Sequence, residues 1–262
     1  MDTAKAPRMP VLFVGHGSPM NAIEESAFAR NWRHLGEVLP RPRAILCVSA
    51  HWETPGVAVT AVERPRTIHD FYGSPEALYQ VTYPAPGAPA LAERVVALLA
   101  EHAAVELDDS WGLDHGAWSV LRRMVPGADI ATLQLSLDYR QPPEWHYALG
   151  RALRPLRDEG VLILGSGNIV HNLGVMRPTG RAFPWAVAFD AAARDAIAAG
   201  EHASLIHYER LEGAALAVPT HEHYLPLLYV LGAAETGASP AFSAAEIVFG
   251  SISMRCVLLG AA

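Results

Sequence analysis

Three apolar runs in this chain each lead directly into a short segment that combines glycine or serine with histidine. The runs and the histidines that follow them are Val11–Val14 with His16, Ala44–Val48 with His51, and Val161–Leu164 with His171 after Gly165-Ser166-Gly167. Runs of this kind are typical of strands buried on both faces of an α/β sheet, where ligands bind at the carboxyl ends of the strands. Because imidazole is the commonest protein ligand of transition metals, the pattern indicates a metal site at one edge of a sheet.

Strand-like and helix-like segments alternate along the chain. This predicts an α/β fold with a central, mostly parallel or mixed sheet flanked by helices and an active site at the carboxyl-terminal rim of the strands. The predicted strands are Val11–Val14, Ala44–Ser49, Val57–Val62, Ile130–Leu137, Val161–Leu164 and Ile247–Leu259, the last being one bent strand or a strand pair around Gly250. The predicted helices are Glu24–Val38, Pro89–Ala103, His115–Val125, Pro142–Leu156, Trp185–Ala199 and Tyr224–Leu231. We expect 64–89 and 204–220 to be long functional loops, and residues 1–262 to form a single catalytic domain.

Composition excludes several classes of protein. The net charge is −7 and no stretch is strongly basic, which argues against nucleic-acid binding. No apolar run reaches transmembrane length, and residues 1–5 lack the apolar core of a signal peptide. Cys47 and Cys256 both lie in apolar runs and are expected to be buried free thiols in a reducing compartment. The sequence therefore predicts a soluble, cytoplasmic protein.

Most of the 12 histidines need no special role. Solvated or locally hydrogen-bonded imidazoles are expected at His34, His102, His146, His202 and His207. His115 is different, because Asp114 before it is a typical helix N-cap and the helix dipole would keep its imidazole neutral. That position suits a hydrogen-bond partner for substrate or oxygen. His171 is interpreted as an active-site base or an extra metal ligand.

A further group of possible ligands is the run His221-Glu222-His223. One of these side chains, together with His16 and His51, would complete a three-ligand face suited to catalytic zinc or to non-haem ferrous iron. Spacing alone does not choose among the three residues or between the metals. The HExxH, GxGxxG, Walker and G-x-S-x-G motifs are absent, which disfavours a helical zinc protease, a phosphate loop and a serine nucleophile.

A set of longer motifs gives the chain a specific resemblance. The motifs are Gly15-His16-Gly17-Ser18-Pro19-Met20, Ser49-Ala50-His51-Trp52, Ile68-His69-Asp70-Phe71, Tyr83-Pro84-Ala85-Pro86-Gly87, Asp114-His115-Gly116, Gly167-Asn168-Ile169-Val170-His171-Asn172 and Glu222-His223-Tyr224-Leu225-Pro226-Leu227. In this order they closely resemble the 4,5-DOPA extradiol dioxygenase family, one of the class III (LigB-like) extradiol ring-cleavage dioxygenases. The resemblance runs from about Pro10 to the C-terminus.

The resemblance implies a mononuclear site with His16, His51 and His223 as metal ligands, and with Glu222 as the rival third ligand. It implies Fe(II) for activity and Zn(II) as a frequent occupant of purified protein. A catechol and dioxygen would be the substrates. His171 would be a fourth ligand or the base that accepts a phenolic proton, and His115 would hydrogen-bond to the charged oxygen intermediate.

Two residues depart from the family pattern and leave the particular substrate open. Ser74 stands where relatives often have phenylalanine, and His221 before Glu222 is uncommon. Two other functions compete with ring cleavage on the same fold. One is a zinc-dependent hydrolase with His171 as the base, and the other is a non-catalytic metal-binding module.

Overall fold

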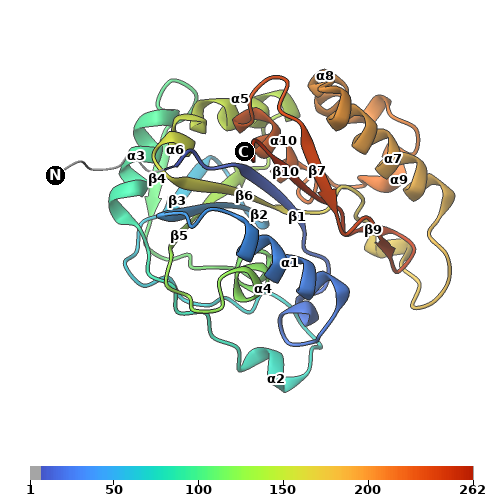
Figure 1. Ribbon diagram of the computed structural model, residues 1–262, viewed down its shortest axis with the longest axis horizontal. Coiled ribbons are helices and arrows are strands. Elements are labelled where there is room, and N and C mark those ends of the chain that lie inside the picture. Colours follow the sequence, from blue (N-terminus) through green and yellow to red (C-terminus); the bar gives the residue numbers. More distant parts are fainter. Residues whose placement is uncertain (1–6, 262) are drawn as a thin grey trace.

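The structure, a computed structural model, describes residues 7–261, and within that range an eight-stranded mixed sheet crosses the molecule (Figure 1). The first residues, where no signal peptide is predicted, lie outside the described part. The strand order is β4-β3-β5-β2-β6-β1-β10-β7. The strand bounds are β1 (Val11–Gly15), β2 (Ala44–Thr54), β3 (Val57–Thr60), β4 (Val105–Asp108), β5 (Ala131–Asp138), β6 (Val161–Gly167), β7 (Pro240–Ser243) and β10 (Cys256–Leu259).

The centre of the sheet is parallel, and the edges are mixed. β5, β2, β6 and β1 run parallel to one another, whereas β10 pairs antiparallel with β1, and β7 pairs antiparallel with β10. At the other edge, β3 is antiparallel to β5, and β4 is parallel to β3. The predicted fold class is confirmed. The parallel centre brings the carboxyl ends of β2, β6 and β1 to one rim.

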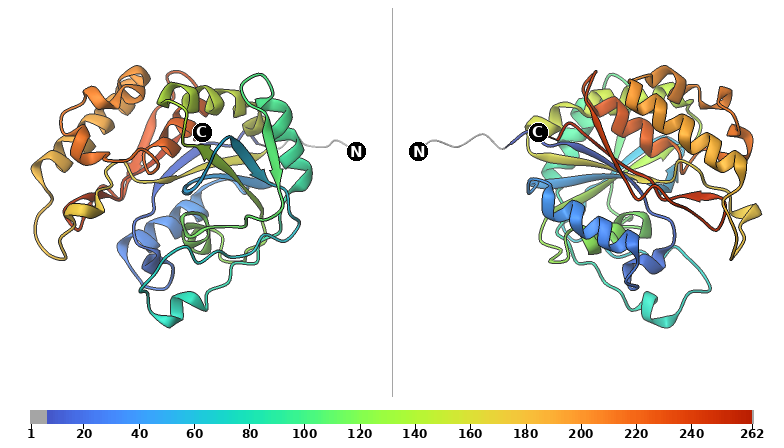
Figure 2. Two further views of the ribbon diagram at one scale, coloured as in Figure 1. Left: turned by 180° about the vertical axis from the view of Figure 1, so that it is seen from behind. Right: turned by 45° about the vertical axis from the view of Figure 1, so that its right-hand side comes forward.

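Side chains alternate between two apolar cores, because successive residues of a strand point to opposite faces. Val11 and Phe13 belong to one core, and Leu12 and Val14 belong to the other. Helices cover both faces, as the second view in Figure 2 shows. The helix bounds are α1 (Ala27–Val38), α2 (Glu76–Tyr79), α3 (Pro89–Leu99), α4 (His115–Met124), α5 (Pro143–Leu153), α6 (Pro155–Asp158), α7 (Pro184–Ala199), α8 (His202–Ile206), α9 (Ala214–Ala217) and α10 (Leu225–Ala233).

Helix α4 begins where its capping residue predicts. The Asp114 carboxylate accepts a hydrogen bond from the Ala117 amide at 3.2 Å, and Ser26 caps α1 in the same way through Ala29. The cap places His115 at the first residue of α4. Within residues 7–261 none of the helices combines the length and hydropathy that a membrane crossing requires.

Three expectations for the secondary structure need correction. Two strands, β4 and β7, were not predicted, since each is short, lies at the sheet edge and lacks a buried apolar run. For the long C-terminal run, the structure contains the strand pair around Gly250, formed by β8 (Ile247–Val248) and β9 (Ile252–Ser253), and the end of the run, β10, joins the main sheet. The segment 204–220 is not a plain loop, because α8 ends in it and α9 lies within it. The segment 64–89 is mostly loop but contains α2.

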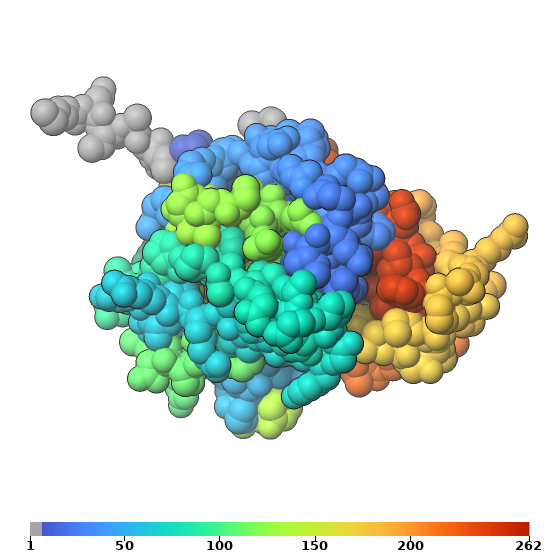
Figure 3. Space-filling view, turned by 90° about the horizontal axis from the view of Figure 1, so that it is seen from below, coloured from blue at the N-terminus to red at the C-terminus, as the bar shows by residue number. Residues whose placement is uncertain are grey.

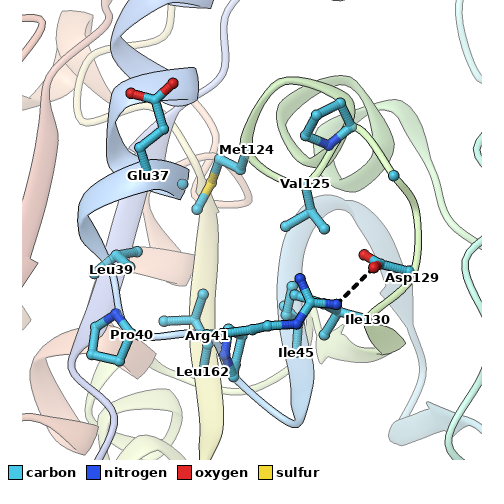
Figure 4. A pocket seen from close by; sticks show the side chains of 14 residues that line it. Glu37, Leu39, Pro40, Arg41, Ile45, Met124, Val125, Asp129, Ile130 and Leu162 are labelled. Carbon is cyan, nitrogen blue, oxygen red and sulfur yellow. Dashed lines mark ion pairs between the residues drawn. The ribbon is translucent and has the colours of Figure 1, made fainter.

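Two cavities lie at opposite ends of the parallel strands. We call these two rims the carboxyl edge and the amino edge of the sheet. The one at the carboxyl ends of the strands has a volume of about 490 Å³ and contains histidines. Seen from below, the loop that carries α2 lies beside the segment that follows β1 and close to the segment that follows β6 (Figure 3). The other cavity, of about 410 Å³, lies where β2, β5 and β6 begin and α1 and α4 end (Figure 4).

Candidate metal centre

Five histidines from five different elements line the cavity at the carboxyl edge. His16 follows β1, His51 lies near the end of β2, His115 opens α4, His171 follows β6 and His223 precedes α10. Their rings are packed against one another, with centroid distances of 3.4 Å for His171 and His223, 3.9 Å for His51 and His115, and 5.4 Å for His16 and His223. The structure therefore brings together His16, His51, His115, His171 and His223, whereas His221, one of the candidate third ligands, does not line this cavity.

Local backbone features aim two of these elements at the cavity. The pairing of β2 with β5 shifts register between Val48 and Glu53, and His51 lies within this irregular stretch. The amino end of α4 packs closely on β2 because residue 116 is glycine. A Cβ at Gly116 would lie 2.4 Å from Ser49 Oγ and 3.0 Å from His51 Cδ2. A larger residue there would push His115 away from His51.

Hydrogen bonds determine which nitrogen of His16 faces the cavity. Ser166 Oγ lies 2.6 Å from the Gly116 carbonyl oxygen, to which it donates its single proton. Ser166 must then accept from His16 Nδ1, 3.0 Å away, so that His16 Nε2 carries the lone pair. This Nε2 lies 2.9 Å from Nε2 of His51. Two ring nitrogens at this distance form a donor pair suited to a shared metal ion.

Asp70 is a site residue to which sequence reasoning gave no role. Its Oδ1 accepts a hydrogen bond from the His115 amide at 2.9 Å, and its Oδ2 lies 3.0 Å from His115 Nδ1 and 3.5 Å from His51 Nδ1. Burial acts to raise the pKa of Asp70, but the hydrogen bonds from His115 outweigh it and lower the pKa. The motif containing Asp70 was visible in the sequence, but only folding shows that its loop returns to His115 and His51.

Glu222 contacts His223, and its carboxylate also lies within 4.8 Å of a ring nitrogen of His171. Its Oε1 lies 3.1 Å from His223 Nδ1 and accepts a hydrogen bond from Thr220 Oγ1 at 2.9 Å. Burial acts to raise the pKa of Glu222, but the hydrogen bonds from His223 and Thr220 lower it to about 2. His221 lies outside the cavity, with Nε2 3.9 Å from Glu53 Oε1.

Burial keeps four of the imidazoles, those of His16, His51, His171 and His223, neutral. It lowers the pKa of His16 and of His51 well below 6.5, and neighbouring histidines lower both further. Burial and the nearby His223 lower the pKa of His171 to about 3, and burial also lowers the pKa of His223. Neutral imidazole is the form that binds a metal ion, and oxygen acceptors at Nδ1 orient the rings of His16, His115 and His223. The donor chemistry of this cluster fits a metal ion.

The ligand atoms fall into two neighbouring groups, each within 4.8 Å. One group is His16, His51 and His115, and the other is His171, Glu222 and His223. The five histidines expected to be ordinary lie outside the cavity lining. Of these, His146 is fully buried and bonds through Nδ1 to the Tyr229 hydroxyl at 3.0 Å, and His202 bonds to Tyr147.

Comparison with known proteins gives one consistent family. Residues 9–252 match the family model described as the catalytic LigB subunit of aromatic ring-opening dioxygenase. A protein of Escherichia coli K12 named 4,5-DOPA dioxygenase extradiol is 50% identical over 97% of this chain and 95% of its own length. A protein of Beta vulgaris with the same name is 44% identical over 85% of each chain. The crystal structure of an uncharacterized protein from Escherichia coli K12 matches with a TM-score of 0.85 and 46% identity, covering 97% of this chain and all of that one.

The fold and the histidine cluster thus define an α/β enzyme with a metal-binding cavity at the rim of its sheet. The chain belongs to the LigB family of aromatic ring-opening dioxygenases. It is an oxidoreductase that cleaves aromatic rings in the extradiol manner.

Proposed function

We propose that this enzyme cleaves the ring of a catechol with dioxygen at a single ferrous ion held by His16, His51 and His223. The observation that carries the proposal is the facing pair of Nε2 atoms on His16 and His51, 2.9 Å apart. The name shared by the relatives, 4,5-DOPA dioxygenase extradiol, supports a catechol of the DOPA type as substrate. When bound, ferrous iron supplies the redox chemistry that zinc lacks.

His223 is proposed as the third ligand in preference to Glu222. The Glu222 carboxylate is engaged with His223 Nδ1 at 3.1 Å, a contact that would orient the ring and leave Nε2 free. His223 also lies beside the facing pair, with its ring centroid 5.0 Å from that of His51 and 5.4 Å from that of His16.

His171 is proposed as the base that accepts a proton from a catechol hydroxyl. Burial and the nearby His223 lower its pKa, so its ring is neutral and one ring nitrogen carries a lone pair in place of a proton. Its ring lies parallel to that of His223 at 3.4 Å, and its amide donates to the Ala217 carbonyl at 2.9 Å. The ring is therefore held at the edge of the proposed ligand set, where it could also serve as a fourth ligand.

His115 is proposed to donate a hydrogen bond to the oxygen on which charge develops during the reaction. Asp70 holds its Nδ1 at 3.0 Å, and Phe71 packs edge-on against its ring with a centroid distance of 5.7 Å. Its side chain is almost completely buried, so its ring has little freedom to move. A fixed donor of this kind costs little reorganisation when the charge appears.

The proposal extends to the domain organisation of the chain and to its cellular compartment. We propose that the whole chain acts as one catalytic domain, because the two apolar cores share one sheet. The buried free thiols of Cys47 and Cys256 favour a reducing compartment, and we propose the cytoplasm.

The proposal is tested by loading the protein with Fe(II) without oxygen and then supplying air and a panel of catechols. We expect one dioxygen consumed per catechol, both atoms of labelled dioxygen in the product, and the absorbance of a ring-opened semialdehyde. Protein loaded with Zn(II) should bind catechols without consuming oxygen. An iron-loaded protein that takes up no oxygen with any catechol would refute the proposed function.

A further inference from the structure

A smaller hollow lies next to the cavity at the carboxyl edge. It has a volume of about 300 Å³ and is lined by Ser18, Met20, Asn21, Glu24, Ser26, Phe28, Val248, Phe249 and Met254. We call this space the side hollow. Of its lining residues, Ser18 and Phe249 also line the cavity that contains the histidines. These two side chains therefore lie at the boundary between the two spaces.

One wall of the side hollow is held in place by its own hydrogen bonds. Ser18 Oγ accepts a hydrogen bond from the Met20 amide at 3.2 Å, and Asn21 Nδ2 donates to the Ser18 carbonyl at 3.1 Å. Ser26 Oγ in turn donates to Asn21 Oδ1 at 2.7 Å. Because these polar groups satisfy one another, the wall is formed without any contribution from a ligand.

The opposite wall contains Phe249 in an unusual backbone conformation. Its φ is 50°, which is rare for a bulky side chain, and Gly250 follows with a φ of 76°. The Arg177 amide donates to the Phe249 carbonyl at 3.0 Å, and the Phe183 amide donates to the Gly250 carbonyl at 2.9 Å. Strained residues persist where the surrounding structure requires them, and they are enriched at ligand sites. The backbone of this turn is thus fixed by contacts that do not involve the phenyl group.

The phenyl group of Phe249 supplies most of the bulk at the boundary. Ser18 is small, and Gly17 before it has no side chain, because a Cβ there would lie 2.4 Å from Met254 Sδ. Phe249 is 41% exposed, so its ring borders open space rather than filling the core. Truncating this ring should therefore join the two spaces without unfolding the turn.

We propose that Phe249 determines how large a ring substituent this enzyme accepts. A catechol whose hydroxyl groups face the histidines would direct its substituent toward the mouth of the cavity, where the Phe249 ring closes the way into the side hollow. Short substituents, that of DOPA included, fit within the cavity, whereas a chain of several more carbon atoms meets the ring. This inference rests on the proposed catechol chemistry and adds a residue that determines specificity within it.

The test compares two catechols that differ only in the length of an uncharged chain, 4-methylcatechol and 4-hexylcatechol, on the iron-loaded full-length enzyme. We expect kcat/KM for the hexyl compound to be about tenfold or more below that of the methyl compound. Calorimetric binding to the zinc-loaded protein should show the same order. Equal use and equal binding of the two compounds by the parent enzyme overturn the inference.

Truncation of the ring tests Phe249 directly. Phe249→Ala should raise kcat/KM for 4-hexylcatechol relative to 4-methylcatechol by about tenfold. Phe249→Gly should give the same shift, since glycine adopts the positive φ of this position without strain, and it serves as the second variant if the alanine protein folds poorly. An unchanged ratio in the folded variants overturns the inference.

The matched control truncates another exposed apolar side chain of the same cavity. Leu173 lines the cavity at the carboxyl edge but not the side hollow. Leu173→Ala should therefore change the two catechols alike and leave their ratio as in the parent enzyme. A rise of the ratio equal to that in Phe249→Ala contradicts a particular role for Phe249.

A filling variant tests whether the longer chain enters the side hollow. Glu24 lines this hollow and is exposed, so a larger side chain at this position would occupy it. Adding Glu24→Phe to Phe249→Ala should return the ratio of the two catechols toward that of the parent enzyme. If the double variant keeps the whole gain, the side hollow is not the space that the chain enters, and that part of the inference is overturned.

These outcomes separate the inference from the proposed function. Absence of turnover with L-DOPA and with both alkyl catechols refutes ring cleavage, while binding to the zinc-loaded parent and Phe249→Ala proteins still decides the role of the ring. Turnover of both alkyl catechols with a ratio that no Phe249 variant changes keeps ring cleavage and overturns only the inference about substituent size.

Discussion

Two cavities of similar volume lie at opposite edges of one sheet, and their linings differ in kind. The cavity at the carboxyl edge, about 490 Å³, collects five histidines. The cavity at the amino edge, about 410 Å³, is lined by side chains such as Leu39, Ile45 and Met124 and by the exposed ion pair of Arg41 and Asp129 at 2.8 Å (Figure 4). Its lining, all within the described residues, holds no histidine or cysteine.

The two cavities have similar volumes, so volume does not explain why only one collects histidines. What differs is which ends of the strands and helices face the cavity. Helix α4 reaches both cavities, with His115 at its first residue and Met124 at its last. At the carboxyl edge, strand ends and helix starts present loops and unpaired amide groups, which suit ligands and charge. At the amino edge, the same elements contribute mainly apolar residues and exposed loops.

The largest expected effect is loss of metal from the carboxyl cavity. His223→Ala should lower affinity for Fe(II) or Zn(II) by more than about 100-fold, beyond the effect usual for residues that only support a ligand. Metal content after dialysis measures this, and Asp129→Ala at the amino cavity is the control that should keep its metal. Full metal content in His223→Ala combined with loss in His115→Ala would assign the third ligand to His115.

The next effect separates catalysis from metal binding. His171→Gln should lower kcat by about 10²–10⁴-fold, since it removes the proton acceptor, while metal content stays close to that of the parent protein. Oxygen uptake and metal analysis on the same samples check both statements. If the metal is lost as well, His171 is a ligand and the base lies elsewhere.

A buried histidine outside both cavities predicts how acid affects the fold. Burial lowers the pKa of His146 to about 4, below the 6.5 of an unfolded chain. The unfolded state therefore binds more protons as pH falls from about 6.5 to 4, and stability falls over that range by up to about 3 kcal/mol. Urea unfolding of the metal-free protein at pH 7 and pH 4.5 should show less acid sensitivity in His146→Gln. Exposed His34→Gln should match the parent, and equal sensitivity in all three would contradict the prediction.

A smaller loss of metal affinity is expected when the Ser166 hydroxyl, which orients the His16 ring, is removed. Ser166→Ala removes the acceptor for His16 Nδ1, so the ring can rotate or change tautomer. We expect a loss of about 10–100-fold in metal affinity, the usual range for a group that holds a ligand in place. Competition with a chromophoric chelator measures it. Unchanged affinity would mean that packing alone holds His16.

The smallest effect belongs to the amino cavity. Arg41→Ala breaks an exposed ion pair with Asp129, which should change the free energy of unfolding by less than about 1 kcal/mol. Turnover of catechols should not change, because this cavity takes no part in the chemistry. A marked loss of activity in Arg41→Ala would show that the two edges are coupled.

Sequence patterns predicted the central strands and the helices with good accuracy, since long apolar runs and capping residues act locally. Val161–Leu164 became part of β6, and Asp114 capped α4 as expected. The patterns failed at β4 and β7, because a short edge strand is specified by its neighbour more than by its own residues. They also missed the helical turns in 204–220.

By itself, the sequence determined that three buried strands lead into segments that contain His16, His51 and His171, because this follows from residue order and hydropathy. Only the tertiary structure decided which groups meet. It brought Asp70 to His115 and Ser166 to His16, pairs that are far apart in the chain. It also turned the Glu222 carboxylate toward the ring of the adjacent His223. It also brought Phe71, Leu173 and Phe249, from three distant segments, into the lining of one cavity, since the shape of a cavity depends on how a chain packs and not on any one stretch of it.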